Sequence, residues 1–450
     1  MQVGSTFIAA LTAWLLVLGT NLSAFASPDS LKAARAAFER KDYDNAAKRL
    51  DDLIQASPGQ SAAYELRAVV QGYRGRPEHA LADYDQLVTT AGKPDRPDLL
   101  RDICLGLLTY LLSHDQEMVR GAAATALGEF GPAGSQTALN LALRDPAPRV
   151  RVFAIQTAGR LGRAAALPAV RDAVADPDVS VRIAALSTLG LSKDPVVVSV
   201  VRRGLSDQDP IAQLVAREAL IRLKQPQPSQ PLLQAARDFS PSVRGAALGI
   251  LGRIKEPAAL PVLTLGLHDP DASVRSFAAG ALGDFGASST VAALAEALND
   301  QDPYVRNFAA ASLGRLNAKA AIPALWGAVK DSDSLVRLAA AESLVRLGEG
   351  EAALVFRELV KDPEYGVRSA AVGAMARTSP ARATAFALEA LDDPAPRVRV
   401  AAVQALGRVE GKRAIPYLRR ALLDKDPTVR AFGAGHLGAL AADRKGKRGD

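Results

Sequence analysis

Apolar residues recur at helical spacing along most of this chain. In the segment VRNFAAASLG (305–314), Val305, Ala309 and Leu313 fall at i, i+4 and i+8, so they share one face of an α-helix. A shorter apolar segment accompanies this pattern in its copies, for example PALWGAVK (323–330), and Asp-rich turns such as DQDP (300–303) separate the two. The pattern therefore predicts pairs of helices joined by tight turns.

One arginine marks each copy of the longer pattern, and the copies follow one another at intervals of 31 residues. The marked positions are Arg120, Arg151, Arg182, Arg244, Arg275, Arg306, Arg337, Arg368, Arg399 and Arg430, with Gln213 in the one vacant place. An aspartate lies six residues before each position except the first, where His114 stands. Eleven copies without an insertion predict a solenoid, because each short repeat can bury its apolar face only against its neighbours.

These letters, D-P-x-x-x-V-R-x-x-A-x-x-A-L-G, resemble HEAT repeats of the phycobilisome-lyase-like subtype over residues 97–442. The resemblance implies an all-α fold, a right-handed α-solenoid of helix pairs. It implies little about function, since repeats of this type occur in scaffolds, enzyme subunits and adaptors alike.

Residues 27–94 repeat with a different period, 34 residues. Alignment of the two halves pairs Ala46 with Ala80 and Leu53 with Leu87, and each half carries a turn, RKDYD (40–44) or RGRPE (74–78). The small residue at the helix crossing and Pro58 at the end of the first copy resemble tetratricopeptide repeats. The sequence thus divides into a tetratricopeptide-like pair (27–94) and a HEAT-like solenoid (95–442).

The chain begins with an apolar run, FIAALTAWLLVLG (7–19), followed by AFA (24–26) before Ser27. This order is typical of an export signal with its cleavage site, so we interpret 1–26 as a signal peptide and expect a periplasmic or secreted protein. The alternative is an uncleaved membrane anchor; after cleavage no stable membrane insertion is expected. At the other end, 443–450 forms a basic tail.

The composition restricts the kinds of functional site that we expect in this chain. The net charge of +7 on 450 residues permits an acidic partner without demanding one. Cys104 is the only cysteine, and the four histidines stand in separate repeats, so neither an intramolecular disulfide nor a metal site is expected. The motifs of serine hydrolases, P-loops and dinucleotide sites are missing from the sequence, so we expect no enzyme activity and no cofactor.

The repeated arginine and aspartate are better explained by structure than by ligand binding. At the turn before its helix the aspartate can cap backbone N–H groups or accept from the next copy's guanidinium, and a residue present once per repeat suits neighbour coupling. The copy with Gln213 also carries the Pro-rich connection KQPQPSQP (224–231). We expect a locally weakened stack there, with simple sequence drift as the alternative.

A second basic column offers a binding surface. Nine residues beyond the repeated arginine, seven of eleven copies carry another arginine: Arg160, Arg222, Arg253, Arg315, Arg346, Arg377 and Arg408. In HEAT-type solenoids the second helix of each pair usually lines the concave side, where a row of arginines would attract an acidic partner. The alternative is that each cation only stabilises its helix C-terminus. Phe153, Phe277, Phe308 and Phe432 are expected to fill the core.

Three functions remain open. The first is a non-catalytic scaffold or adaptor outside the cytoplasm, which holds a protein or peptide along the solenoid groove. The second is an enzyme subunit related to bilin lyases, which attach chromophores in the cytoplasm, and the export signal argues against it. The third is a nucleic-acid-binding solenoid, which export, the modest charge and the absence of aromatic stacking columns disfavour. The sequence favours the scaffold.

Overall fold

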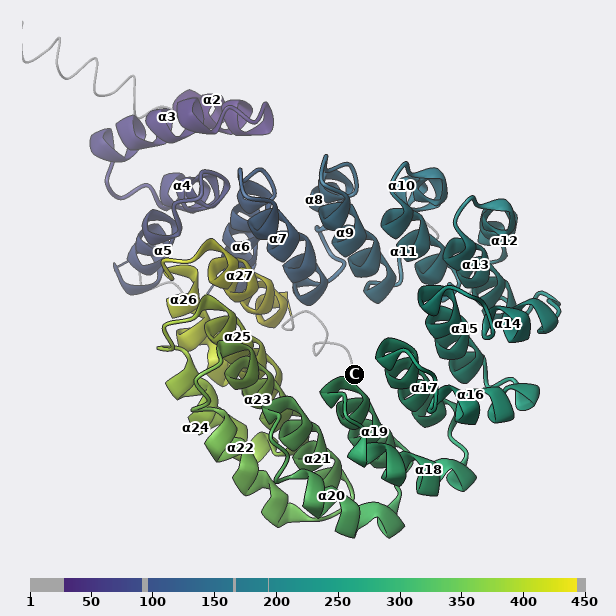
Figure 1. Ribbon diagram of the computed structural model, residues 1–450. Helices are drawn as coiled ribbons and strands as arrows, with labels where there is room; N and C mark the ends of the chain where they lie inside the picture. The colour runs from purple at the N-terminus through teal and green to yellow at the C-terminus, as the bar shows by residue number, and fades with distance from the viewer. Residues whose placement is uncertain (1–27, 91–95, 165–166, 193, 443–450) are drawn as a thin grey trace, which may run out of the picture. The chain divides into compact units, whose positions relative to one another are not determined.

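The computed structural model describes residues 28–90, 96–164, 167–192 and 194–442, and within these residues it contains helices and no strands. The expected signal peptide and basic tail lie outside them. The chain divides into two compact units (Figure 1): unit 1 takes in residues 1–138 and 418–450, and unit 2 takes in 139–417. These units do not follow the change of repeat period near residue 95, because the C-terminal helix belongs with the N-terminal ones.

Unit 1 contains both expected pairs of the N-terminal repeat and the first pair of the 31-residue repeat. Its helices are α2 (Pro28–Glu39), α3 (Tyr43–Ala56), α4 (Ser61–Tyr73), α5 (Pro77–Asp85), the π-helical turn η1 (Gln86–Thr90), α6 (Pro97–Leu111), α7 (Glu117–Phe130) and α27 (Pro427–Ala442). The turns predicted at 40–44 and 74–78 separate α2 from α3 and α4 from α5. The helix pairs are therefore where the 34-residue period places them, and membership of the tetratricopeptide family stays a prediction.

Helix α27 packs against α6 and α7, far from it in sequence. Two glycines permit this approach: a Cβ on Gly435 would lie 2.6 Å from the Ala126 carbonyl oxygen, and Gly438 faces the Phe130 ring. Arg101 fastens the contact, since its Nη1 donates to the Gly438 carbonyl at 2.6 Å and to the Phe130 carbonyl at 3.2 Å. Cys104 is fully buried in this packing, and burial raises the pKa of its thiol to about 12.

In unit 2 the second helices of the pairs form one continuous layer. They are α9 (Pro148–Arg160), α11 (Val179–Leu189), α13 (Pro210–Arg222), α15 (Pro241–Ile254), α17 (Ala272–Phe285), α19 (Pro303–Arg315), α21 (Ser334–Arg346), α23 (Tyr365–Thr378) and α25 (Pro396–Val409). Each packs beside the next, and within the unit this layer lies on the inner side of the curve (Figure 1).

The first helices form the outer layer. They are α8 (Gln136–Ala142), α10 (Pro168–Asp172), α12 (Val198–Arg203), α14 (Gln230–Ala235), α16 (Leu260–Gly266), α18 (Val291–Glu296), α20 (Ile322–Ala328), α22 (Ala353–Leu359), α24 (Pro380–Ala390) and α26 (Ile415–Leu422), the first and last of which cross the unit boundaries. Short 3₁₀ turns extend most of them: η2 (Ala173–Ala175), η3 (Pro195–Val197), η4 (Gly204–Ser206), η5 (Pro257–Ala259), η6 (Ser288–Thr290), η7 (Ala297–Asn299), η8 (Lys319–Ala321), η9 (Gly350–Ala352) and η10 (Gly411–Ala414).

The repeated letters explain why helices form and how they stack. In the copy of α19, Asp302 caps the helix by accepting from the backbone N–H of Tyr304 and Val305, and Pro303 occupies the first turn, where its missing N–H costs little. The Val305, Ala309 and Leu313 side chains are fully buried, as the apolar spacing predicts. The all-helical, two-layered unit is the expected α-solenoid.

Candidate protein-binding surface

The repeated arginines and aspartates form hydrogen-bonded bridges between successive repeats. The Nε and Nη2 atoms of Arg275 donate to the Asp300 carboxylate at 2.8 and 2.9 Å, while Nη1 donates to two backbone carbonyls of its own turn. The carboxylate also closes its own turn by accepting from the Asp302 N–H. The same bidentate bridge joins Arg151 to Asp176, Arg182 to Asp207, Arg244 to Asp269, Arg306 to Asp331 and Arg368 to Asp393.

The bridges confirm that these residues are structural, and they correct one detail. Each aspartate accepts from the arginine of the preceding copy, whereas the sequence suggested the following copy. The second helix is capped instead by the residue two positions after the bridging aspartate, for example by Asp302. The hydrogen bonds from Arg275 hold the pKa of the Asp300 carboxyl below its usual value, because they stabilise its ionised form.

Among the described residues, the bridge is missing at one repeat interface and indirect at another. The Gln213 amide still donates to the Asp207 carbonyl at 2.7 Å, but it is too short to reach the next repeat. There, within the described residues, the Asp238 carboxylate accepts only from the backbone N–H of Ser240. In a later copy, Arg337 approaches Asp362 only to 3.9 Å, because its Nη2 donates to the Ser334 hydroxyl, which in turn donates to Asp362 at 2.8 Å. The ladder is therefore interrupted between α13 and α15 and loosened between α21 and α23.

The second arginine column lies on the inner layer, and all seven of its side chains are exposed. Most of them meet acidic partners that the sequence argument did not consider. Arg222 and Arg253 both donate to Glu218, the latter through two hydrogen bonds of 2.8 and 2.7 Å. These hydrogen bonds raise the pKa of the Arg253 guanidinium.

Glu342 repeats this arrangement four copies later. It accepts two hydrogen bonds of 3.1 Å from Arg377 on the next helix and lies 3.5 Å from Arg346 on its own. Arg315 lies 3.6 Å from Asp284, and Arg160 donates to the Thr157 hydroxyl. Arg408 makes no ion pair or hydrogen bond with any residue in the described part of the chain. Some arginines of the column therefore link neighbouring helices, and others keep a charge that a ligand could meet. The role of the column in partner binding stays a prediction.

The phenylalanine column is not core. Phe153, Phe277 and Phe308 expose 37, 49 and 40% of their surface, and only Phe432 is buried. The rings of the middle two lean over glycines of the preceding repeat, Gly245 and Gly280, so the backbone supports one face and the other is left open. The expectation of core filling is wrong for three of the four, because position +2 from the repeated arginine points along the inner layer.

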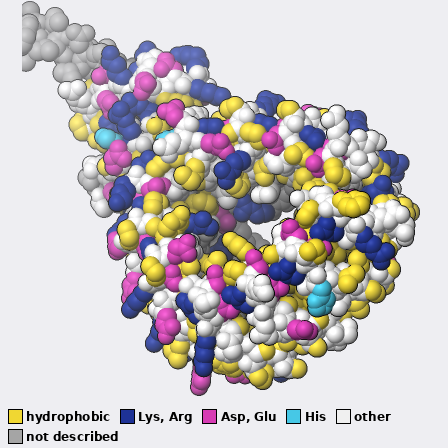
Figure 2. Space-filling view, viewed as in Figure 1, with side chains coloured by type: hydrophobic (Ala, Val, Ile, Leu, Met, Phe, Trp, Pro, Cys, Tyr) yellow, Lys and Arg dark blue, Asp and Glu magenta, His cyan; other side chains and the backbone are white. Residues whose placement is uncertain are grey.

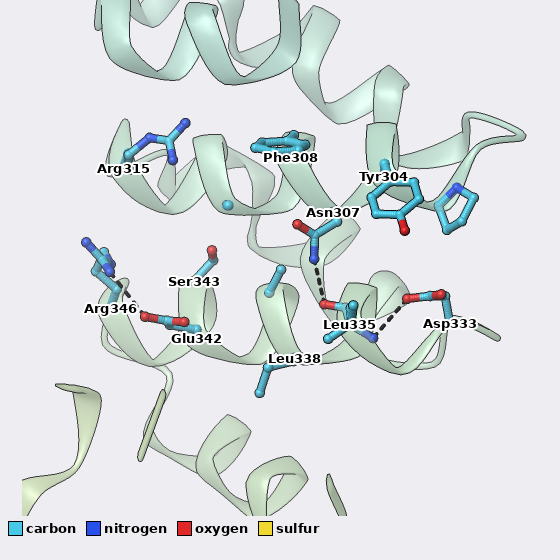
Figure 3. A pocket seen from close by; sticks show the side chains of 13 residues that line it. Tyr304, Asn307, Phe308, Arg315, Asp333, Leu335, Leu338, Glu342, Ser343 and Arg346 are labelled. Carbon is cyan, nitrogen blue, oxygen red and sulfur yellow. Dashed lines mark hydrogen bonds and ion pairs between the residues drawn. The ribbon is translucent and has the colours of Figure 1, made fainter. Parts of the chain in front are cut away.

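One phenylalanine lies in a groove with two of the predicted arginines. The groove has a volume of about 650 Å³ and runs between α19 and α21. Figure 3 shows Arg315 and Arg346 at one end, Tyr304 at the other, and Phe308 between them. Leu335, Leu338 and Ala339 complete the apolar wall, and Asn307 donates to the Leu335 carbonyl at 2.8 Å.

Sequence reasoning found the arginines of this groove and missed its aromatic end. Tyr304 is 66% exposed and stands two residues before the repeated arginine, at a position that most copies fill with smaller or polar residues. That contrast between copies is the signal that could have indicated it. On the face that Figure 2 shows, basic side chains are interspersed with acidic and hydrophobic ones.

The described residues contain no cluster of three or more His, Cys, Asp or Glu side chains able to hold a metal ion. None of their helices is both long and apolar enough to cross a bilayer.

Comparison with known proteins identifies the repeat. A family model described as HEAT repeats matches residues 135–221, 229–307, 291–376 and 353–438. No curated protein sequence matches the chain. Among solved structures, human deoxyhypusine hydroxylase in complex with glycerol is similar at 22% identity over 56% of this chain and 98% of its own, with a TM-score of 0.30.

Two other solved structures are similar at the same level. The complex of CpcE and CpcF of phycocyanin lyase from Nostoc sp. PCC7120 has 20% identity over 59% of this chain and 91% of its own, with a TM-score of 0.32. The nuclear import protein Kap95p, bound to RanGDP, has 15% identity over 84% of this chain and 60% of its own, with a TM-score of 0.34. At such identities the likeness concerns the fold alone.

Proposed function

Because this chain belongs to the HEAT-repeat family, we propose that it is a non-catalytic scaffold that holds a segment of another protein along the inner layer of unit 2. The observation that carries this proposal is the groove between α19 and α21, where the exposed rings of Tyr304 and Phe308 lie beside Arg315 and Arg346. Folding leaves these aromatic surfaces in water, with Tyr304 66% exposed and Phe308 40% exposed.

Aromatic and arginine side chains are the residue types that contribute most to protein–protein binding energy. They are enriched among the few positions whose truncation costs at least about 2 kcal/mol of binding free energy. The ion pairs of the column also favour a protein over a polyanion: because Glu218, Asp284 and Glu342 offset much of the local positive charge, the surface is suited to a partner of mixed chemistry.

We place this scaffold outside the cytoplasm, on the strength of the apolar run at 7–19 and the AFA segment at 24–26. Fractionation of the source cells, with N-terminal sequencing of the purified chain, tests the location. A mature N-terminus at Ser27 in the exported fraction is the expected result. A chain that starts at residue 1 in the cytoplasm would contradict it.

The binding proposal is tested by in-cell crosslinking and affinity capture of the full chain, tagged at its C-terminus. A double variant, Phe308→Ser with Arg346→Glu, alters the groove at two exposed positions. Matched controls are Arg357→Glu on α22 and Arg382→Glu on α24, two exposed arginines of the outer layer. We expect one protein to be recovered by the unaltered chain and by both controls and to be lost with the groove variant. Equal recovery by all four would exclude this groove as the binding surface.

A further inference from the structure

We infer that the α19–α21 groove recognises an extended acidic peptide segment in which one large apolar side chain and one carboxylate stand about three residues apart. This inference rests on the proposed function and adds the chemistry of the partner. The groove offers two unlike ends that are held apart by the rigid spacing of one helix, and a ligand must satisfy both.

The apolar end is preformed and open. Tyr304 and Leu335 are 66 and 38% exposed and face the groove from opposite helices (Figure 3). The Phe308 ring is held from behind, because a Cβ on Gly280 of the preceding repeat would lie 3.4 Å from its edge. A peptide side chain placed between these surfaces removes apolar area from water on both sides and meets rings that lose little freedom on binding.

The cationic end has hydrogen-bond donors that are not used within the described part of the protein. The Nη2 atom of Arg315 donates to the Gly280 carbonyl at 3.1 Å and to the Ser312 hydroxyl at 2.9 Å, which orients the guanidinium, while no hydrogen bond of its Nη1 appears among the described residues. Arg346 is held only loosely, 3.5 Å from Glu342. Two guanidinium groups on neighbouring helices can therefore receive one carboxylate from the ligand.

Helix geometry sets the spacing of the ligand. Phe308 and Arg315 lie seven residues apart on α19, which corresponds to about 10 Å along the axis at 1.5 Å per residue. An extended peptide advances about 3.3 Å per residue, so the same distance spans about three residues. Between the two ends, the Asn307 amide nitrogen is already bonded to the Leu335 carbonyl, which leaves its oxygen to accept a peptide N–H.

Charge fixes which end takes the acid. Asp333 lies at the Tyr304 end, and its carboxylate accepts hydrogen bonds from the N–H groups of Leu335 and Val336. Its negative charge would repel a second carboxylate there. At the other end Asp284 lies 3.6 Å from the Nε atom of Arg315, and Glu342 competes with the ligand for Arg346. Removal of that competing charge is therefore expected to strengthen binding of an acidic peptide.

The test uses the full chain and fluorescein-labelled peptides in an anisotropy titration at low salt. The reference peptide carries Leu-x-x-Asp in a Gly/Ser background, and its controls place the two residues adjacent, place them eight residues apart, or replace Asp with Asn. We expect the reference peptide to bind at least tenfold more tightly than each control. Equal affinity for all four peptides would overturn the inference.

Variants of the protein locate the binding. Phe308→Ala and Arg346→Gln are each expected to weaken the reference peptide about tenfold, while the outer-layer control Arg357→Gln leaves it unchanged. Glu342→Gln is expected to strengthen binding several-fold. Because Glu342 also bridges to Arg377, the variant Arg377→Gln serves as its control: it breaks the same bridge but leaves the competing carboxylate, so it is not expected to strengthen binding.

The outcomes separate this inference from the proposed function. Protein capture that depends on Phe308 and Arg346, together with peptides that bind irrespective of spacing, would retain the scaffold and overturn the peptide motif. Spacing-dependent binding that Phe308→Ala and Arg346→Gln do not affect would overturn it as well, since the peptide would then lie elsewhere.

Discussion

Two repeat interfaces of unit 2 are held together at opposite edges. Between α17 and α19 the bidentate link is at the turn, where Arg275 donates two hydrogen bonds to Asp300, while at the inner edge Arg315 approaches Asp284 only to 3.6 Å. Between α13 and α15 that link is missing because Gln213 replaces the arginine, and Arg253 instead donates two hydrogen bonds to Glu218 near the other end of the helices. The bidentate arginine–carboxylate link therefore lies at the turn in one interface and at the inner edge in the other.

The interface between α21 and α23 shows the same exchange in partial form. Its turn bridge is long, at 3.9 Å between Arg337 and Asp362, and Glu342 accepts two hydrogen bonds from Arg377 at the inner edge. Among the eleven copies, only these two carry an acidic residue five positions beyond the repeated arginine. In these three interfaces, one bidentate arginine–carboxylate bridge is present in each, at the turn in the first and at the inner edge in the other two. Four predictions test that comparison.

The largest effect is expected from Glu218→Ala. Glu218 is 5% exposed and serves two arginines, so its loss leaves the α13–α15 interface without an ionic bridge at either edge. We expect a loss of about 2–3 kcal/mol in unfolding free energy, below the full cost of an unpaired buried charge because Arg253 can turn to water. Hydrogen exchange localised to α13 and α15 is the measurement, and faster exchange spread evenly over unit 2 would contradict it.

A smaller effect is expected at the turn edge. Arg275→Ala removes two charge-assisted hydrogen bonds and is expected to cost about 1–2 kcal/mol. Arg337→Ala is its control, because Arg337 makes the same bonds to its own turn but reaches the next repeat only through a 3.9 Å contact and through the Ser334 hydroxyl, which donates to Asp362. Its cost is expected to be lower by about 1 kcal/mol in denaturant unfolding. Equal costs would mean that the turn bonds, not the bridge, matter.

Restoring the missing bridge is expected to stabilise the protein. Gln213→Arg places a guanidinium opposite Asp238, as in the other copies, and should add about 0.5–1 kcal/mol. The gain should vanish in an Asp238→Asn background, since the amide cannot replace the carboxylate of the pair. A gain that persists there would point to helix propensity instead.

The smallest effect is on pH dependence. Arg275 holds the pKa of Asp300 below its unfolded-state value, so this carboxylate contributes stability above that value and loses it as pH falls toward the lowered folded-state pKa. In Asp300→Asn the unfolding free energy should therefore decrease less as the pH is lowered through the acid range. A decrease identical to that of the unaltered chain would contradict this prediction.

The fold was predictable because its information is local and repeated. The buried faces, the capping aspartates and the first-turn prolines act within one repeat, so a single copy of the pattern specifies its own helix pair. The glycine that ends the pattern has its reason only in the stack: a Cβ on Gly252 would lie 2.5 Å from the Ala281 carbonyl oxygen of the next repeat. Likewise, the packing of α27 on α6 and α7 joins segments too far apart for any repeat rule to connect.

The sequence predicted the arginines of the candidate site but not its exposed aromatic residues. The arginines stand out because a charge that recurs at one position is visible in the letters. Phe308 was assigned to the core because a recurrent Phe resembles packing, and hydrophobicity alone does not say which way position +2 points; Tyr304 was not considered. What the sequence determined is the set of elements and their order, since helix formation follows from spacing, caps and turns. What the tertiary structure decided is which arginines are bridged, which rings stay in water, and where a groove opens, because those depend on the distances between residues of successive repeats.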